Sequence, residues 1–326
     1  MQSYSNIQSL LQTPLRETSE LIRKSLESDI SLLEGINRHL LDHSGKFLRP
    51  VLCLLSAGAA GGITADSVRY AAASELLHNA TLLHDDVVDG STSRRGEPTV
   101  SAVLGSPAAV LVGDFWLVRA VQCILGSENS DDRVIRLFAA TLSHLSEGEM
   151  LQMEKAGTAD TSREDYLRII FSKTASLFKT AATAGAISAG APQDVEQILG
   201  EFGRCIGIAF QMQDDILDYT PSASLGKPTG QDIMEQKITA PLLMAFEGAS
   251  YEEESSIRSA VRGVIDNPSL AEEVRDFVAS RRGTAKAAGW ASDYIAKAEA
   301  LLEKLPEGEY RDALLEFARI VGERKK

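Results

Sequence analysis

The chain has 326 residues, of which 44% are hydrophobic and 24% are charged, and its 46 acidic residues against 33 basic ones give a formal net charge of −13. This length suffices for one large domain or two ordinary ones. The acidic balance disfavours a general nucleic-acid binder, which needs a net basic face. The cysteines, Cys53, Cys123 and Cys205, are odd in number and lack metal-site spacing. They indicate a reducing compartment and predict a cytoplasmic protein.

The N-terminal stretch "MQSYSNIQSLLQTPLRETSE" is polar and lacks the apolar core of a secretory signal. No stretch reaches about 18 consecutive apolar residues, so we expect no transmembrane segment. In most segments apolar residues recur every three or four positions, which predicts helices nearly throughout and no sheet. We therefore expect an all-α protein of about a dozen helices that forms a single domain over residues 1–326. Four residues after breaks are candidate N-caps: Thr64, Ser106, Ser130 and Ser162.

The first notable segment in chain order is "GKFLRP", residues 45–50. Pro50 is typical of the first position of a helix, which would place Lys46 and Arg49 at a helix start. Helix N-termini already favour anions. The simpler interpretation is that both cations are ordinary residues near a cap.

The next segment, "DSVRYAAASELLHNATLLHDDVVDG", has helical periodicity without a breaker. In a helix Asp85 and Asp89 share a face and Asp86 borders it, so the three carboxylates repel one another. Hard divalent cations, which prefer carboxylate oxygens, would offset this repulsion. His78 precedes Asp85 by two turns and lies about 10 Å away on the same face. Alone, the aspartates could be a solvated face and His78 a core histidine.

The same aspartate spacing returns in "FQMQDDILDYT", with Asp214, Asp215 and Asp218, and Gln211 lies on the same face three residues earlier. A glycine-containing loop with cations follows each motif. Arg94 and Arg95 follow the first, and Lys227 follows the second in "GKPTG". The simpler interpretation of "GKPTG" is a plain turn, and it is not a Walker loop. Two acidic helix ends that face each other would form a site for several metal ions, with diphosphate as the natural anionic ligand.

An ordered set of motifs accompanies these aspartates. Its members are "GKFLRP" (45–50), "ELLHNATLLHDDVVDGSTSRRG" (75–96), "GDFW" (113–116), "EGEMLQ" (147–152), "KTASLF" (173–178), "GIAFQMQDDILDY" (207–219) and "GKPTGQDIMEQKITAP" (226–241). With this set, over most of its length, the chain resembles the trans-isoprenyl diphosphate synthases. The resemblance implies a single large helical bundle of the isoprenoid synthase type with a central apolar cavity.

The resemblance also implies the chemistry. An allylic diphosphate ionises, the double bond of isopentenyl diphosphate attacks the carbocation, and a proton is lost. The implied cofactor is Mg²⁺, three ions per active site, and the implied assembly is a homodimer whose product is membrane-seeking.

Site residues follow from the resemblance, position by position. Asp85, Asp86, Asp89, Asp214, Asp215 and Asp218 would bind magnesium. Lys173, Lys237 and Arg94 would contact the allylic diphosphate, with Lys227 in a loop that closes over it. Lys46, Arg49, His78 and Arg95 would form the isopentenyl diphosphate site, and Thr174 and Gln211 would present oxygen dipoles to the cation. "EGEMLQ" receives no role, and His39, His43, His84 and His144 are expected to be structural.

Ala80 and Thr81, just over one turn before Asp85, bear on product length. By resemblance, bulky aromatic residues there stop the growing chain early. The small Ala80 therefore favours a long product, hexaprenyl to decaprenyl diphosphate, although Ala80 could instead pack against a neighbouring helix.

Three alternatives stay open on sequence: a farnesyl or geranylgeranyl diphosphate synthase, a class I terpene cyclase, and a non-catalytic subunit of a heteromeric synthase. A cyclase would normally carry an Asn/Ser/Glu metal triad in place of the second motif, and a non-catalytic subunit would lack aspartates or cations that are present here. One departure from the family is Gly322, where an apolar residue is usual. This glycine bears on one expectation, namely how firmly the basic C-terminal tail closes over the substrate.

Overall fold

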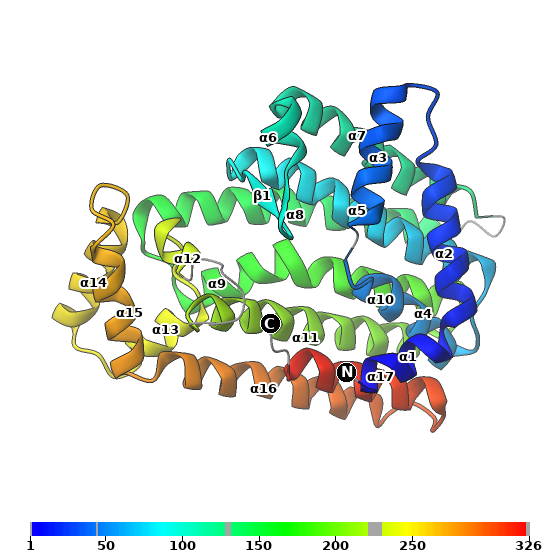
Figure 1. Ribbon diagram of the computed structural model, residues 1–326. Coiled ribbons are helices and arrows are strands. Elements are labelled where there is room, and N and C mark those ends of the chain that lie inside the picture. Colours follow the sequence, from blue (N-terminus) through cyan, green and yellow to red (C-terminus); the bar gives the residue numbers. More distant parts are fainter. Residues whose placement is uncertain (1, 44, 128–131, 221–229, 324–326) are drawn as a thin grey trace. The chain divides into compact units, whose positions relative to one another are not determined.

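The protein is described by a computed structural model that covers residues 2–43, 45–127, 132–220 and 230–323. Within these residues it consists of seventeen α-helices, one π-helical segment and one two-stranded hairpin (Figure 1). The all-α prediction is thereby confirmed, although the helices outnumber the dozen expected because several breaks separate short helices. Lys227 and Ser130 lie outside the described residues.

The first half of the chain contains α1 (Gln2–Leu10), α2 (Gln12–Ser25), α3 (Ser31–Asp42), α4 (Leu48–Ala60), α5 (Ala65–Val88), β1 (Ser93–Arg94), β2 (Glu97–Pro98), α6 (Val100–Leu104), α7 (Ser106–Leu125) and α8 (Asp132–Thr158). The second half contains α9 (Arg163–Ile170), η1 (Phe171–Ala175), α10 (Ser176–Ser188), α11 (Gln193–Asp218), α12 (Gln231–Met234), α13 (Ala240–Phe246), α14 (Tyr251–Gly263), α15 (Leu270–Ser280), α16 (Gly283–Leu302) and α17 (Glu309–Gly322).

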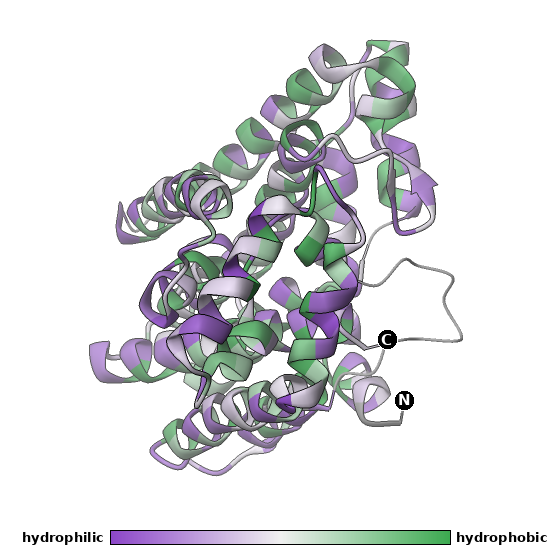
Figure 2. Ribbon diagram, turned by 90° about the vertical axis from the view of Figure 1, so that its left-hand side faces the viewer, coloured by the Kyte–Doolittle hydropathy of each residue, from purple (hydrophilic) through white to green (hydrophobic). Residues whose placement is uncertain are grey.

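Local sequence explains where several helices begin. Thr64 and Ser162 each accept a hydrogen bond from the backbone N–H three residues later and complete a capping box, as predicted. Ser106 is not an N-cap: it is the first residue of α7, and Gly105 precedes it with a φ of 84°. Figure 2 shows hydrophilic and hydrophobic residues alternating along most helices, which is typical of helices with one buried face.

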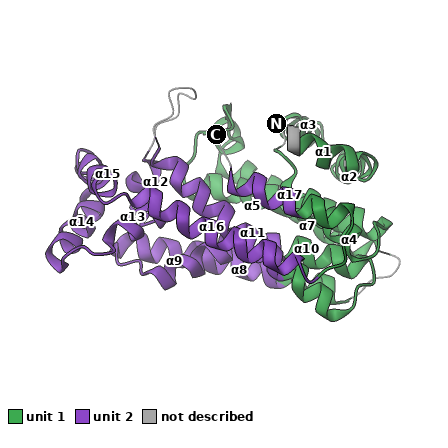
Figure 3. Ribbon diagram, turned by 90° about the horizontal axis from the view of Figure 1, so that it is seen from below, with its two compact units in different colours: residues 1–139, 180–200, 305–314 green, residues 140–179, 201–304, 315–326 purple. Residues whose placement is uncertain are grey.

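The structure divides into two compact units, coloured separately in Figure 3. Unit 1 comprises residues 1–139, 180–200 and 305–314, and unit 2 comprises residues 140–179, 201–304 and 315–326. The single domain over residues 1–326 stays a prediction.

Helix α5 is the centre of unit 1 and packs against α7, α4 and α2. Gly113 on α7 makes a close approach possible, because a Cβ there would lie 2.4 Å from His84 Nε2 on α5. The buried Trp116 Nε1 donates to Asn37 Oδ1 at 2.8 Å and ties α7 to α3. The close approach at His84 lies one residue before the first aspartate motif on α5.

In unit 2, α11 approaches the η1 segment closely. A Cβ at Gly207 would lie 2.5 Å from the Cα of Ala175. This contact brings the face of α11 that carries Gln211 next to Thr174. All three cysteines are buried free thiols, as the sequence indicated.

One described helix, α7, is long and apolar enough to cross a membrane by length and composition, with a mean hydropathy of 1.7 in its most apolar window. Buried core helices of soluble proteins pass the same test. The absence of a transmembrane segment therefore stays a prediction.

Candidate active site

The first aspartate motif lies at the C-terminal end of α5. Asp85 and Asp86 are in its last turn, and Asp89 is the C-cap with helical φ and ψ. Asp86 is only 5% exposed; its Oδ1 accepts a hydrogen bond from Arg94 Nε at 2.8 Å and lies 2.8 Å from Arg94 Nη2 in an ion pair. A buried carboxylate needs such a partner, so Arg94 balances the charge of Asp86.

Arg94 and Arg95 come from a hairpin that the sequence analysis did not predict. Ser93 pairs with Pro98 and Arg94 pairs with Glu97. The turn residues Arg95 and Gly96 have φ values of 55° and 87°, as a type I′ turn requires. The sequence pairs usual for such a turn are Asn-Gly and Asp-Gly. Here arginine takes the first position, so Gly96 alone could have indicated the turn.

The hairpin directs the two arginines to different partners. While Arg94 binds Asp86, Arg95 Nη1 donates to the His43 carbonyl at 3.1 Å. A cavity of about 60 Å³ lies here and is lined by both arginines, His39, His43 and Asp86, among others. His43 Nε2 also lies 3.7 Å from Glu97 Oε1.

Cations gather around His78 in unit 1. Burial lowers the pKa of His78 well below its ordinary value, and the positive charges of Arg49, Arg95 and Arg94 lower it further. His78 is therefore neutral and can donate a hydrogen bond, while the charge comes from the guanidinium groups. The structure thus brings four predicted substrate-binding residues together in a region that favours an anion.

The start of α4 differs slightly from the prediction. The helix begins at Leu48, with Phe47 as its N-cap in the left-handed region at a φ of 54°. Pro50 is therefore the third helical residue and not the first. Arg49 still lies in the first turn and Lys46 just before the helix, as the sequence analysis expected.

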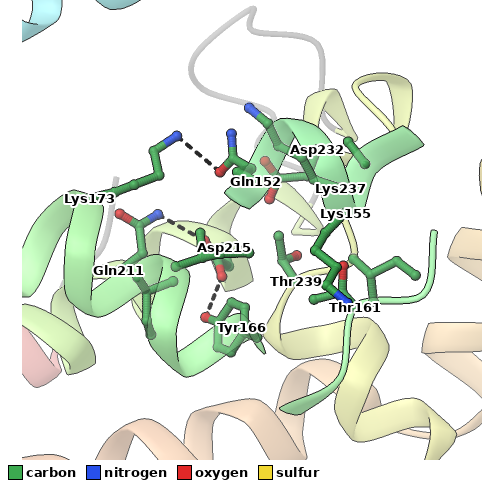
Figure 4. A pocket seen from close by; sticks show the side chains of 14 residues that line it. Gln152, Lys155, Thr161, Tyr166, Lys173, Gln211, Asp215, Asp232, Lys237 and Thr239 are labelled. Carbon is green, nitrogen blue, oxygen red and sulfur yellow. Dashed lines mark hydrogen bonds between the residues drawn. The ribbon is translucent and has the colours of Figure 1, made fainter. Parts of the chain in front are cut away.

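The second aspartate motif ends α11, with Asp218 as the last helical residue. Asp215 is 4% exposed; Tyr166 Oη donates to its Oδ2 at 2.5 Å and Gln211 Nε2 to its Oδ1 at 3.0 Å. Burial raises the pKa of Asp215 to about 6, although both hydrogen bonds oppose the rise. Figure 4 shows Tyr166 and Gln211 reaching Asp215 from two sides.

Two further details of this motif were not predicted. The Asp218 carboxylate accepts hydrogen bonds from the backbone N–H groups of Gln231 and Asp232, at 3.2 and 3.0 Å, and so holds the start of α12. Asp232 is half-buried, and its pKa lies well above the ordinary value because of desolvation and the charges of Asp215 and Asp218. Asp232 is part of the quoted motif "GKPTGQDIMEQKITAP". Its proximity to Asp215 and Asp218 could not be predicted from the sequence, because only the fold brings these residues together.

Lys173 and Thr174 lie in the π-helical segment η1, a type of irregularity that is frequent at functional sites. Lys173 Nζ lies 2.5 Å from Glu149 Oε1 and donates to Gln152 Oε1 at 3.0 Å. Gly148 makes room, since a Cβ there would lie 3.0 Å from Lys173 Cγ. The motif "EGEMLQ", which sequence reasoning left without a role, therefore orients Lys173.

Thr174 and Gln211 form the pair that the sequence analysis expected to face a cation together. Thr174 Oγ1 donates to Gln211 Oε1 at 2.7 Å. Lys237 forms an ion pair with Glu235 two residues earlier.

A cavity of about 160 Å³ unites these residues in unit 2. Its lining includes Lys173, Gln211, Asp215, Lys237, Asp232 and Tyr166 (Figure 4). The cavity is thus lined by both carboxylates and ammonium groups, as a site for a metal-bound anion would be. Among the described residues, no three His, Cys, Asp or Glu side chains already converge as a metal cage.

Together, a helical fold, two aspartate-rich helix ends and cation-lined pockets define a helical enzyme for diphosphate substrates. The family model "Polyprenyl synthetase" matches residues 30–278. The chain is also 35% identical to the octaprenyl diphosphate synthase of Haemophilus influenzae, over 98% of this chain and 96% of the relative. It is 38% identical to a short chain isoprenyl diphosphate synthase of Methanothermobacter thermautotrophicus, over 95% of this chain and 98% of the relative.

Solved structures agree with the sequence relatives. A decaprenyl diphosphate synthase from Rhodobacter capsulatus superposes with a TM-score of 0.90 at 34% identity, covering 98% of each chain. A polyprenyl synthase from Caulobacter crescentus, complexed with calcium and isoprenyl diphosphate, gives 0.90 at 33% identity and covers 99% of this chain and 98% of its own. The chain therefore belongs to the polyprenyl synthetase family, as the motifs indicated.

Proposed function

We propose that this protein condenses isopentenyl diphosphate with an allylic diphosphate, head to tail, and makes a long-chain product of hexaprenyl to decaprenyl length. The observation that carries the proposal is the pair of aspartate-rich helix ends, each with cations beside it, in a chain that belongs to this family. The small Ala80 and the octaprenyl and decaprenyl relatives support the long product.

In the proposed reaction the allylic C–O bond breaks and diphosphate leaves with the bonding electrons. Lys173 and Lys237, with Arg94, bind this diphosphate and stabilise its developing charge. Thr174 and Gln211 turn oxygen atoms towards the carbocation. Lys46, Arg49, His78 and Arg95 hold isopentenyl diphosphate, whose double bond attacks the cation before a proton is lost. Lys227 is proposed to lie in a loop that closes over the allylic diphosphate.

The residues present fit magnesium. Asp215 and Asp218 lie close enough to Asp232 that their charges raise its pKa, and such a concentration of carboxylates, one of them buried, favours a divalent cation. Asp214, Asp215 and Asp218 would hold magnesium in unit 2, and Asp85, Asp86 and Asp89 would hold it in unit 1, with three ions per active site. Magnesium, when bound, supplies positive charge to the leaving diphosphate.

Incubation with isopentenyl and allylic diphosphates, followed by chromatography of the dephosphorylated products, tests the proposal. Chains of 30 to 50 carbons support it. Farnesyl or geranylgeranyl products would mean the short-chain alternative, which the Methanothermobacter relative favours. A cyclised product, or no turnover by this chain alone, would contradict the proposal.

The two substrate sites should be separable by substitution. We expect Arg95→Ala and His78→Ala to raise the KM for isopentenyl diphosphate at least about tenfold, because each removes a hydrogen bond to a charged group. Arg94→Ala and Lys173→Ala should instead raise the KM for the allylic primer. Steady-state kinetics with each substrate varied in turn measures both constants. Equal losses for both substrates would show that the assignment to two sites is wrong.

The proposed homodimer has a candidate surface on α7. Leu111, Val118 and Leu125 are 68%, 53% and 60% exposed, and their seven-residue spacing aligns them in one stripe. Such a stripe on a cytoplasmic protein favours a second copy of the same helix, since two symmetric stripes cover each other.

We expect Leu111→Glu to convert a dimer to a monomer in analytical ultracentrifugation, because it places a carboxylate in the apolar contact. Ile265→Glu is the control, since Ile265 is 64% exposed but lies in the turn after α14. A monomeric wild-type protein, or an unchanged dimer in Leu111→Glu, would rule out this surface.

A further inference from the structure

The N-terminal helix reaches the loop that carries Lys46. Tyr4 Oη, on α1, donates a hydrogen bond to the Lys46 carbonyl, 42 residues later in the chain. Ile7 and Leu11 are 1% and 0% exposed and anchor α1 and the residue after it in the core of unit 1. Burial, and then the charge of Glu75, raise the pKa of Tyr4 to about 12, so its phenol stays protonated and remains a donor.

Arg95 also contacts the same loop. A Cβ at Gly45 would lie 2.6 Å from Arg95 Nη2, and Arg95 Nη1 donates to the His43 carbonyl at 3.1 Å. Phe47, directly after Lys46, has the left-handed φ of 54° that a bulky residue adopts only when its surroundings enforce it. The backbone around Lys46 is therefore fixed by contacts from outside the loop.

We propose that Tyr4 is a positioning residue for the isopentenyl diphosphate site. By fixing the Lys46 carbonyl, Tyr4 sets the direction in which the Lys46 side chain leaves the loop, next to Arg95 and the start of α4. The inference rests on the proposed function, which places Lys46, Arg49, His78 and Arg95 around that diphosphate. Tyr4 precedes residues 30–278, the part matched by the family model, so the inference concerns a segment outside that match.

Tyr4→Phe tests this role, because it keeps the ring and removes only the hydroxyl. We expect the KM for isopentenyl diphosphate to rise about fivefold, because the Lys46 side chain is then no longer held in its binding direction. The kcat and the KM for the allylic primer should stay unchanged, and the melting temperature should fall by no more than the loss of one hydrogen bond causes. Calorimetric titration with isopentenyl diphosphate alone should show the same loss of affinity. Tyr251→Phe, at a tyrosine that is 84% exposed, is the matched control and should change nothing.

His78→Ala and Lys46→Ala, measured in the same titration, separate this inference from the function on which it rests. If they weaken binding and Tyr4→Phe does not, the role of Tyr4 is wrong while the substrate site stands. If neither of them weakens binding, the proposed site itself is wrong. A Tyr4→Phe protein with a lowered melting temperature and equal KM changes for both substrates would show a merely structural residue.

Discussion

Asp85→Ala and Asp214→Ala should each lower kcat by about a thousandfold, while the helical circular dichroism spectrum stays that of the wild type. Each substitution removes a carboxylate at a helix end where the proposed metal ions would bind, and loss of a single stabiliser of developing charge costs about 10²–10³ in rate. Both residues lie at helix termini, so their loss does not open the core. Turnover under saturating substrates, with magnesium varied, is the measurement.

Removal of the metal should reproduce this loss in the wild-type protein. We expect activity to vanish with a chelator and to return when magnesium is restored. The control for Asp85→Ala and Asp214→Ala is Asp293→Ala, which removes an exposed aspartate on α16 and should leave turnover unchanged. Full activity of the wild type in a magnesium-free assay would refute the metal assignment for both motifs.

Ala80→Phe should shift the products from long chains to farnesyl or geranylgeranyl diphosphate. Ala80 lies five residues before Asp85, about 7.5 Å along α5 and turned by about 140°. A phenylalanine ring at this depth would block a channel that runs along the flank of the helix, and growth would stop after a few condensations. The first condensation should persist, because the aspartate motif is untouched. Product chromatography measures the shift.

Ala80 is 0% exposed, so a phenylalanine there could also destabilise the protein, and a control substitution is needed. Overpacking a filled core with a ring costs about 1–3 kcal/mol in stability. Ala71 is equally buried on α5 and lies nine residues earlier, about 180° around the helix. Ala71→Phe should lower the melting temperature but leave product length unchanged. If Ala80→Phe behaves in the same way, Ala80 packs against a neighbouring helix and does not control product length.

The parts of the site that follow helical periodicity were accessible from the sequence. The spacing of Asp85 and Asp89, and of Gln211 and Asp214, places each pair on one face of one predicted helix, and the structure has both helices. Contacts across the fold were not accessible. Tyr166 is 49 residues from Asp215, and Gln152 is 21 residues from Lys173, so only helix packing brings them together.

The hairpin was missed for a different reason. Two-residue strands are too short to show an alternating pattern, and the turn carries Arg95 where asparagine or aspartate is usual. The bond between Arg94 and Asp86 spans eight residues through a non-helical turn, so no spacing rule indicates it. The facing of the two aspartate motifs stays a prediction, since the motifs belong to different compact units.

The ion pair between Arg94 and Asp86 has a thermodynamic consequence for the proposed site. A cation that approached Asp86 alone would leave Arg94 without its carboxylate, and an anion that approached Arg94 alone would leave a buried carboxylate uncompensated. An anion and a cation that arrive together satisfy both halves of the pair at once. Metal and diphosphate should therefore bind with positive, reciprocal cooperativity, each increasing the affinity of the protein for the other by the same factor.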